Sequence, residues 1–386
     1  MTAPAAGVGP SALLQADDGE TILLPEWIAR TLGLDAFGTA GLAVGALIGA
    51  FVIANVMLVN AGIVIWAKRK VTAAFTDRIA VNRVGPFGLF IIVADAVRLL
   101  SKELIVPEGV DRPAWDLAPL VIAASALLGF AVIPWGTMGG VQIQLADPEV
   151  GLVLVFAIAS VASVGLVMAG YASANKYSML GGLRAVAQNI AYEIPLIVAA
   201  ASVVIFAGSL QLSEIVAVQQ QTLVSIGGVS IPAWFALVNP LAFVLFMIAN
   251  LAEVGRNPFD IPEAPTEIVA GYQTEYSSVY FVLVYMGEFI HLFLGGAIAA
   301  VVFLGGGAGP VLPEPVWFLI KIWAVFLFTQ WARASFPRLR IDQLIEIGWK
   351  GLLVLAFANL IITAAIFGLF GDDLGLQAAT VQVIFA

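Results

Sequence analysis

The 386-residue sequence contains no cysteine and a single histidine, and charged residues make up only 11% of it. Without cysteine, the chain has no thiolate ligand for an iron–sulfur cluster or for zinc, no disulfide and no thiol nucleophile. One histidine excludes a multi-histidine centre, so we expect no metal site. The sequence also lacks a GxxxxGK[ST] motif and a GxGxxG between a strand and a helix, which leaves nucleotide binding without local support.

What the sequence does contain is apolar: hydrophobic residues make up 61% of it, and its mean hydropathy is +1.00. Because soluble domains carry roughly twice this share of charge, a water-soluble enzyme is excluded. A helix needs about 20 apolar residues to cross a bilayer core ~30 Å thick. Stretches that meet this requirement lie near residues 36–67, 117–137, 150–172, 190–208, 233–253, 278–304, 315–333 and 350–370. The sequence therefore predicts an all-α polytopic membrane protein with about eight transmembrane helices.

The distribution of lysine and arginine predicts the orientation of these spans, because short basic loops stay in the cytoplasm. With eight spans, all basic residues except Arg30 and Lys321 fall on one side. That side is predicted to be cytoplasmic, which makes the chain a multi-pass cell-membrane protein with both termini outside.

The membrane domain is expected to cover residues 36–371, followed by a short tail, 372–386. Residues 1–35 are acidic and lack the basic start of a secretory signal, so we interpret them as an N-terminal extension. Within it, residues 25–30 are compatible with a short interfacial helix.

The loop after the first span contains a second candidate for an interfacial helix, residues 85–103. Asp95, Arg98 and Lys102 lie at i, i+3 and i+7 on one face, and apolar residues surround them. Two interpretations stay open. The helix either extends its basic side chains to lipid headgroups, or it forms one wall of a lipid-accessible cavity.

Several ionisable residues lie inside the predicted spans, where a central charge costs about 2.5–3.5 kcal/mol on insertion scales. Glu193 precedes Pro195 in the fourth span, and Glu288 and His291 share a helix face at i, i+3. Glu253 ends the fifth span with Arg256 at i+3, a spacing that favours an ion pair. Each acid is a candidate for proton transfer, and the alternative is a neutral or paired acid that fixes helix packing.

Residues 252–278 form the most polar loop. Glu263 and Glu267 are spaced i, i+4, so a helix there would place two like charges on one face and raise the proton affinity of at least one. Coupled acids of this kind are suited to passing protons. The alternative is a solvated acidic loop, against which Phe259 and its apolar neighbours argue.

Five blocks of the sequence resemble the H subunit of respiratory complex I, the membrane-arm subunit that closes the quinone chamber. These are VNRVGPFG (81–88), ADAVRLLSKE (94–103), GYASANKYSMLGGLRAVAQNIAYEIPL (170–196), AEVGRNPFDIPEAPTEIVAGYQTEY (252–276) and ARASFPRLRIDQLIEIGWK (332–350). They occur in the family's order and spacing, from about residue 40 to 370.

The resemblance implies a membrane subunit, without redox centres of its own, of a proton-translocating NAD(P)H (or other donor):quinone oxidoreductase. Ubiquinone or menaquinone would be the substrate, and this chain alone would hold no cofactor. Its partners would be antiporter-like membrane subunits, iron–sulfur subunits of the hydrophilic arm, quinone and lipid, with no nucleic acid. Matched by motif, the proton relay would comprise Asp95, Glu193, Glu253, Glu263, Glu267 and Glu288. The quinone tunnel would include Arg69, Arg78, Phe259 and Arg338, and Arg184 and Arg256 would be charge partners of the acids.

The sequence also departs from the family pattern at four places. Lys68 replaces an acid at the end of the first span, Ala80-Val81 replaces Gly-Pro, Pro265 replaces a further glutamate, and His291 stands where asparagine is common. Histidine is the side chain whose unperturbed pKa lies near neutrality. We therefore hypothesise that His291, close to Glu288, substitutes for a lost proton site.

Two other functions remain as alternatives. The first is a membrane anchor of an energy-converting hydrogenase-type complex, against which Arg69 and Arg78 argue. The second is an ion-coupled secondary transporter that uses Glu193 and Glu288. The large acidic loop and the lack of visible repeats argue against this alternative.

Overall fold

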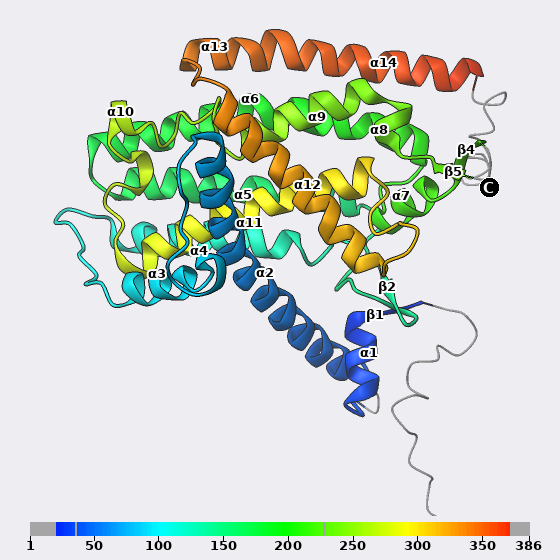
Figure 1. Ribbon diagram of the computed structural model, residues 1–386, viewed down its shortest axis with the longest axis horizontal. Helices are drawn as coiled ribbons and strands as arrows, with labels where there is room; N and C mark the ends of the chain where they lie inside the picture. The colour runs from blue at the N-terminus through cyan, green and yellow to red at the C-terminus, as the bar shows by residue number, and fades with distance from the viewer. Residues whose placement is uncertain (1–20, 35–36, 227–228, 371–386) are drawn as a thin grey trace, which may run out of the picture.

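The computed structural model describes residues 21–34, 37–226 and 229–370, and most of them are helical (Figure 1). The α-helices are α1 (Leu24–Thr31), α2 (Thr39–Phe75), α3 (Ile91–Leu100), α4 (Arg112–Gly129), α5 (Gly151–Ala172), α6 (Lys176–Ala207), α7 (Leu212–Gln219), α8 (Phe235–Val238), α9 (Pro240–Glu253), α10 (Pro265–Ile268), α11 (Ser278–Phe303), α12 (Glu314–Ser335), α13 (Ile341–Glu346) and α14 (Leu353–Phe370). Short 3₁₀ helices cover Pro86–Gly88 and Gly271–Gln273, and a π-helical segment, Ile347–Leu352, joins α13 to α14.

The predicted all-α membrane architecture is confirmed. Among the described residues, six helical segments are long and apolar enough to cross a membrane: α2, α5, α6, α11, α12 and the continuous segment Ile341–Leu369. The other two expected spans correspond to α4, with 18 residues, and α9, with 14. At 1.5 Å per residue, α9 is only about 21 Å long. Asn239 separates α9 from α8, and the side chain of Asn239 accepts a hydrogen bond from the backbone amide of Ala242.

The long helices pack side by side in one bundle. Helix α4 lies against α5 and α11, α6 lies against α5, α9 and α14, and α11 also contacts α12 and α2. Close approach between helices depends on small residues, as is usual in membranes. A Cβ at Gly295 of α11 would lie 2.0 Å from Oδ1 of Asn250 on α9, so a larger residue here would displace the buried Asn250 side chain.

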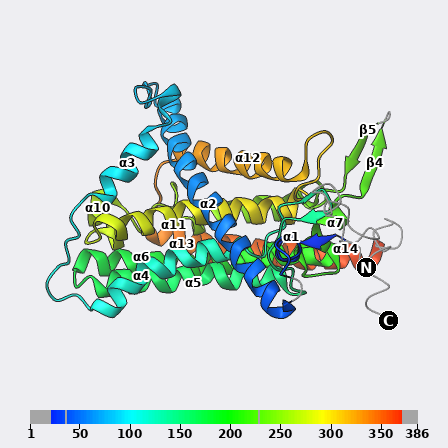
Figure 2. The same ribbon diagram turned by 90° about the horizontal axis from the view of Figure 1, so that it is seen from below.

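The two ends of the bundle differ (Figures 1 and 2). One end carries α3 and α10. The opposite end carries a three-stranded sheet, in which β3 (Val141–Gln142) pairs with β1 (Ile22–Leu23) in parallel and with β2 (Thr137–Met138) in antiparallel orientation. It also carries a hairpin of β4 (Thr222–Ile226) and β5 (Val229–Pro232). Helix α1 and the last turn of α14 lie at this second end, so both described ends of the chain are on the same side of the bundle.

Several boundaries differ from the predicted ones. Helix α6 begins at Lys176 instead of near residue 190, because Asn175 caps it by accepting a hydrogen bond from the amide of Tyr177, and it continues through Pro195. Helix α3, in the segment predicted to be interfacial, is shorter than 85–103, since Gly85 and Gly88 adopt positive φ angles of 74° and 75° before it. Helix α1 covers the short helix expected at 25–30. The tail, 372–386, and most of the N-terminal extension lie outside the described residues.

Candidate functional site

The loop between α9 and α11 folds back into the end of the helix bundle. Phe259, Asp260, Tyr272 and Gln273 are all buried, with 3–9% of their surface exposed. Burial on this scale is incompatible with a solvated acidic loop, so that alternative is wrong. The loop carries its polar groups into the protein interior, where they need partners.

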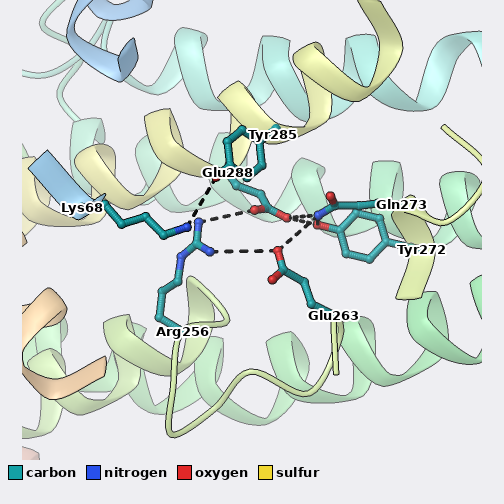
Figure 3. A network of polar contacts seen from close by, with 7 residues as sticks. All are labelled: Lys68, Arg256, Glu263, Tyr272, Gln273, Tyr285 and Glu288. Carbon is teal, nitrogen blue, oxygen red and sulfur yellow. Dashed lines mark hydrogen bonds and ion pairs between the residues drawn. The ribbon is translucent and has the colours of Figure 1, made fainter. Parts of the chain in front are cut away.

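Arg256 is the centre of the resulting network (Figure 3). Its side chain is 2% exposed, and its Nη2 lies 3.4 Å from Oε2 of Glu288. Nη1 of the same guanidinium lies 4.0 Å from Oε1 of Glu263. The carboxylate of Glu288 also accepts hydrogen bonds from the hydroxyl of Tyr272 and from Nε2 of Gln273, the latter at 2.6 Å. Gln273 Nε2 lies 3.3 Å from Glu263 and so connects the two acids.

Lys68 approaches the same network from the end of α2. Its Nζ lies 3.5 Å from the hydroxyl of Tyr285 and 4.8 Å from the centre of the Phe289 ring. The guanidinium of Arg256 lies 4.7 Å from the centre of that ring, so one aromatic side chain contacts both cations. Lys68 is therefore part of the buried network, where cation–π contacts stabilise it.

Burial and neighbouring charge determine the protonation states of the loop residues. Burial raises the pKa of Tyr272 well above its ordinary value, and the carboxylate of Glu288 adds to this effect. Burial alone would lower the pKa of Arg256, but Glu288 and Glu263 outweigh it, and the net shift is upward. Tyr272 is consequently a neutral donor and Arg256 a permanent cation. Burial, followed by the charge of Glu263, also raises the pKa of Asp260.

A cavity of about 60 Å³ lies beside the network. Its lining includes three acids and the histidine, Glu253, Glu263, Glu288 and His291, together with the polar side chains of Ser163, Asn189 and Tyr272. A water molecule needs on the order of 10–15 Å³ of such space and polar partners, and the cavity offers both. The structure thus brings together three of the predicted relay acids and the single histidine.

Glu253 does not form the ion pair that its spacing from Arg256 predicts. Helix α9 ends at Glu253, and Gly255 adopts a φ of +65°, so Arg256 leaves the helical path and turns towards Glu288. Glu253 instead lies 3.5 Å from Nε2 of His291 on α11. The i+3 rule fails here because it holds only while the helix continues.

Glu193 lines a different cavity. It is half-buried on α6, where apolar side chains of α5 and α6 and Ser160 surround a space of about 260 Å³. The proline after it does not interrupt α6. Glu193 thus lines a different cavity from the other acids, on a face of the bundle that opens between α5 and α6.

The predicted like-charge pair of Glu263 and Glu267 is also not formed. Helix α10 begins at Pro265, after Glu263, so the two acids do not share a helix face. Glu263 faces Arg256, whereas Glu267 is exposed and binds Arg184 at 2.6 Å and also Arg338. The hydrogen bond from Arg184 lowers the pKa of Glu267 despite a small opposing effect of burial.

The predicted tunnel residues occupy separate places. Arg69 and Arg78 line one cavity of about 320 Å³ together with Lys68, and Arg69 forms an ion pair of 2.6 Å with Asp95 of α3. Phe259 packs against Tyr192, with ring centres 5.2 Å apart. Neither Phe259 nor Arg338 lines the cavity of the two other arginines. Within the described residues, no cluster of His, Cys, Asp or Glu suits a metal ion.

Sequence reasoning did not single out Tyr272, Gln273, Tyr285 or Phe289. The first two lie in the polar loop and are buried beside two acids. That burial identifies them as part of the site, and it cannot be read from the pattern of residue types. Tyr285 is 217 positions from Lys68 in the sequence. Such a contact depends on the tertiary packing of α2 against α11 and has no local signature.

Comparisons with known proteins place this geometry in context. The family model described as NADH dehydrogenase matches residues 48–364. The chain is 44% identical over 319 residues to one of the NADH-quinone oxidoreductase H subunits of Syntrophobacter fumaroxidans, a match that covers 81% of this chain and 93% of that protein. It is 44% identical over 330 residues to the corresponding H subunit of Thermomicrobium roseum, covering 84% and 96%. It is 45% identical over 313 residues to one of the H subunits of Geobacter metallireducens, covering 80% and 92%.

Proposed function

The chain belongs to the NADH dehydrogenase family as an H subunit of the NADH-quinone oxidoreductases, and we propose that it helps to form the quinone chamber of such a complex and passes redox-linked charge changes through buried carboxylates to proton-pumping subunits. Quinone is the substrate of the complex, and this chain by itself holds no cofactor. Antiporter-like membrane subunits and iron–sulfur subunits of the hydrophilic arm are its partners. Both termini lie outside the cell membrane.

The observation that carries this proposal is the buried network around Arg256 together with the cavity beside it. Ionisable groups at membrane depth are expensive and are usually functional. Here Glu253, Glu263 and Glu288 line one hydratable cavity, and a permanent cation contacts two of them. A proton added to one acid changes the charge balance at the next, so the group is suited to relaying charge.

Lys68 connects the acid network to the candidate quinone site. It lines the 320 Å³ cavity with Arg69 and Arg78, and its ammonium also contacts Tyr285 and Phe289 within the network. Cationic donors in a cavity suit the carbonyl oxygens of a quinone headgroup and the negative charge that develops on reduction. A charge change in this cavity therefore acts first on Lys68 and then, through Coulomb interaction, on Glu288 and Glu263.

The two more distant acids occupy the ends of the proposed relay. Asp95 pairs with Arg69 at the quinone-side cavity, which supports a place near the start of the relay. Glu193 lines the cavity between α5 and α6, a face on which a neighbouring membrane subunit could receive a proton. Glu267, between Arg184 and Arg338, supports a role in fixing the loop at the cytoplasmic end.

The test is to extract the tagged protein from its native membrane in mild detergent, identify the proteins that co-purify, and assay the preparation for quinone reduction. We expect antiporter-like and iron–sulfur partners together with quinone-dependent turnover. A nickel-bearing partner without quinone activity would replace the proposal with a hydrogenase-type anchor. A stable chain without partners would replace it with a transporter.

A further inference from the structure

His291 lies between two parts of the acid cluster. Its Nε2 is 3.5 Å from the carboxylate of Glu253 on α9. One helical turn earlier on α11, Glu288 belongs to the Arg256 network. Both acids and His291 line the same 60 Å³ cavity. The single histidine of the sequence thus spans the gap between Glu253 and the rest of the cluster.

The second ring nitrogen of His291 is unsatisfied. Nδ1 is buried and has no hydrogen-bond partner among the residues that the structure describes. A buried polar atom beside a polar cavity normally binds a water molecule. Water in the cavity would therefore join Nδ1 to Glu288 or Glu263, while Nε2 stays on Glu253.

We propose that His291 carries protons between the Glu288–Glu263 side of the cavity and Glu253, a role that rests on the function proposed above. The protonated carboxyl of Glu288 releases a proton to a cavity water, and that water passes a proton to Nδ1, which gives an imidazolium and a carboxylate. The Nε2–H bond then breaks, and this proton binds the carboxylate of Glu253. Exchange with cavity water, which takes the proton from Nδ1 and returns one to Nε2, restores the starting tautomer. One proton has moved, and no electron has been transferred.

The charged surroundings of His291 favour this exchange. Glu253 faces it from α9, and Glu193 of α6 acts on it electrostatically. Glu288 on its own helix and Glu263 and Arg256 of the loop are further charged groups near the cavity. Lys68 of α2 adds a second cation on the Phe289 ring that Arg256 contacts. Helices α4 and α5 contribute uncharged residues there, among them Ile122, Ala159, Ala162 and Ser163. Acids thus flank both routes to the ring, so a transient imidazolium is stabilised on either side.

The test compares the intact complex with wild-type His291, His291→Asn and His291→Gln, each reconstituted in liposomes, for quinone reduction and for proton translocation between pH 6 and 8. Asparagine and glutamine can still hydrogen-bond Glu253 but cannot carry a proton at these pH values. We expect quinone reduction to continue and the number of protons translocated per quinone to fall several-fold at every pH, because the side chain that transfers the proton is lost. Ser202→Ala, which removes a buried hydroxyl of α6 bonded within its own helix, should leave both readouts unchanged.

The outcomes separate the two proposals. A wild-type complex without quinone-linked translocation overturns the proposed function and this inference with it. A wild-type complex that translocates protons, with an amide variant that does so equally well, overturns the inference alone. Failure of both amide variants to assemble would assign His291 a packing role and would likewise overturn it.

Discussion

The guanidinium of Arg256 and the carboxylate of Glu288 lie 3.4 Å apart, and this ion pair joins the loop after α9 to α11. Arg256 is 2% exposed and Glu288 14%, so water screens the pair little. Glu263 contacts the guanidinium, and Tyr272 and Gln273 donate hydrogen bonds to the carboxylate. This contact therefore holds the acids and the loop in one arrangement.

Replacing Arg256 with methionine should destabilise the subunit strongly. Two carboxylates would remain in the interior without their cation, and breaking a buried pair in this way costs about 3–5 kcal/mol. We expect less assembled complex and a lower thermal unfolding midpoint of the detergent-solubilised complex. Arg256→Lys retains the charge but not the contact with both acids, so its unfolding midpoint should lie between those of wild type and Arg256→Met. A methionine variant as stable as wild type would contradict the assigned role.

Arg78→Met should weaken quinone binding. Arg78 is exposed and lines the cavity that also contains Lys68 and Arg69. Within the described part of the chain, its side chain donates a hydrogen bond only to the nearby Thr76, at 3.0 Å. Loss of one charged hydrogen bond of about 1.5 kcal/mol would raise the KM for quinone ~10-fold. Arg83→Met, at an exposed position of the same loop that does not line the cavity, is the matched control. Equal KM values for the two variants would remove Arg78 from the quinone site.

Lys68→Met should lower coupling between quinone reduction and proton translocation several-fold. Lys68 is the cation shared by the quinone-side cavity and the buried network, so its loss weakens the electrostatic link between them. The control is Lys70→Met, because Lys70 donates to Asn82 and lies over Trp66, away from the network. The ratio of protons translocated to quinone reduced measures the effect, and a ratio equal to that of Lys70→Met would contradict the link.

The pairing of Glu267 with Arg184 predicts that the subunit loses some stability in acid. The hydrogen bond from Arg184 lowers the pKa of this acid in the folded state below its ordinary value of 4.5. Its stabilising contribution is therefore complete above pH 4.5 and disappears as the pH falls through the folded-state value. The unfolding midpoint of wild type minus that of Glu267→Gln should be positive at pH 7 and should shrink below pH 4.5. The difference should be small, because the side chain is 47% exposed and such pairs contribute little. A constant difference would show that the pair does not act through this charge.

The sequence predicted those features that depend on local properties. Hydropathy located the spans, and the cost of charge in a membrane singled out Glu193, Glu253 and Glu288. The partners of these acids were not predictable, because they come from distant segments: His291 reaches Glu253 from another helix. The position of Arg256 depends on a turn at Gly255 that ends the helical spacing, and the placement of Lys68 depends on how α2 packs on α11.

The most direct test of the relay is proton translocation by the reconstituted complex that carries Glu193→Gln. Glu193 is the one relay acid that lines the cavity between α5 and α6, apart from the Arg256 network, so its neutralisation should interrupt transfer without disturbing the ion pairs. Glu214→Gln, at an exposed position of α7, is the control. We predict a fully assembled complex that reduces quinone but translocates several-fold fewer protons, with the control unchanged. Full translocation by Glu193→Gln would contradict this prediction.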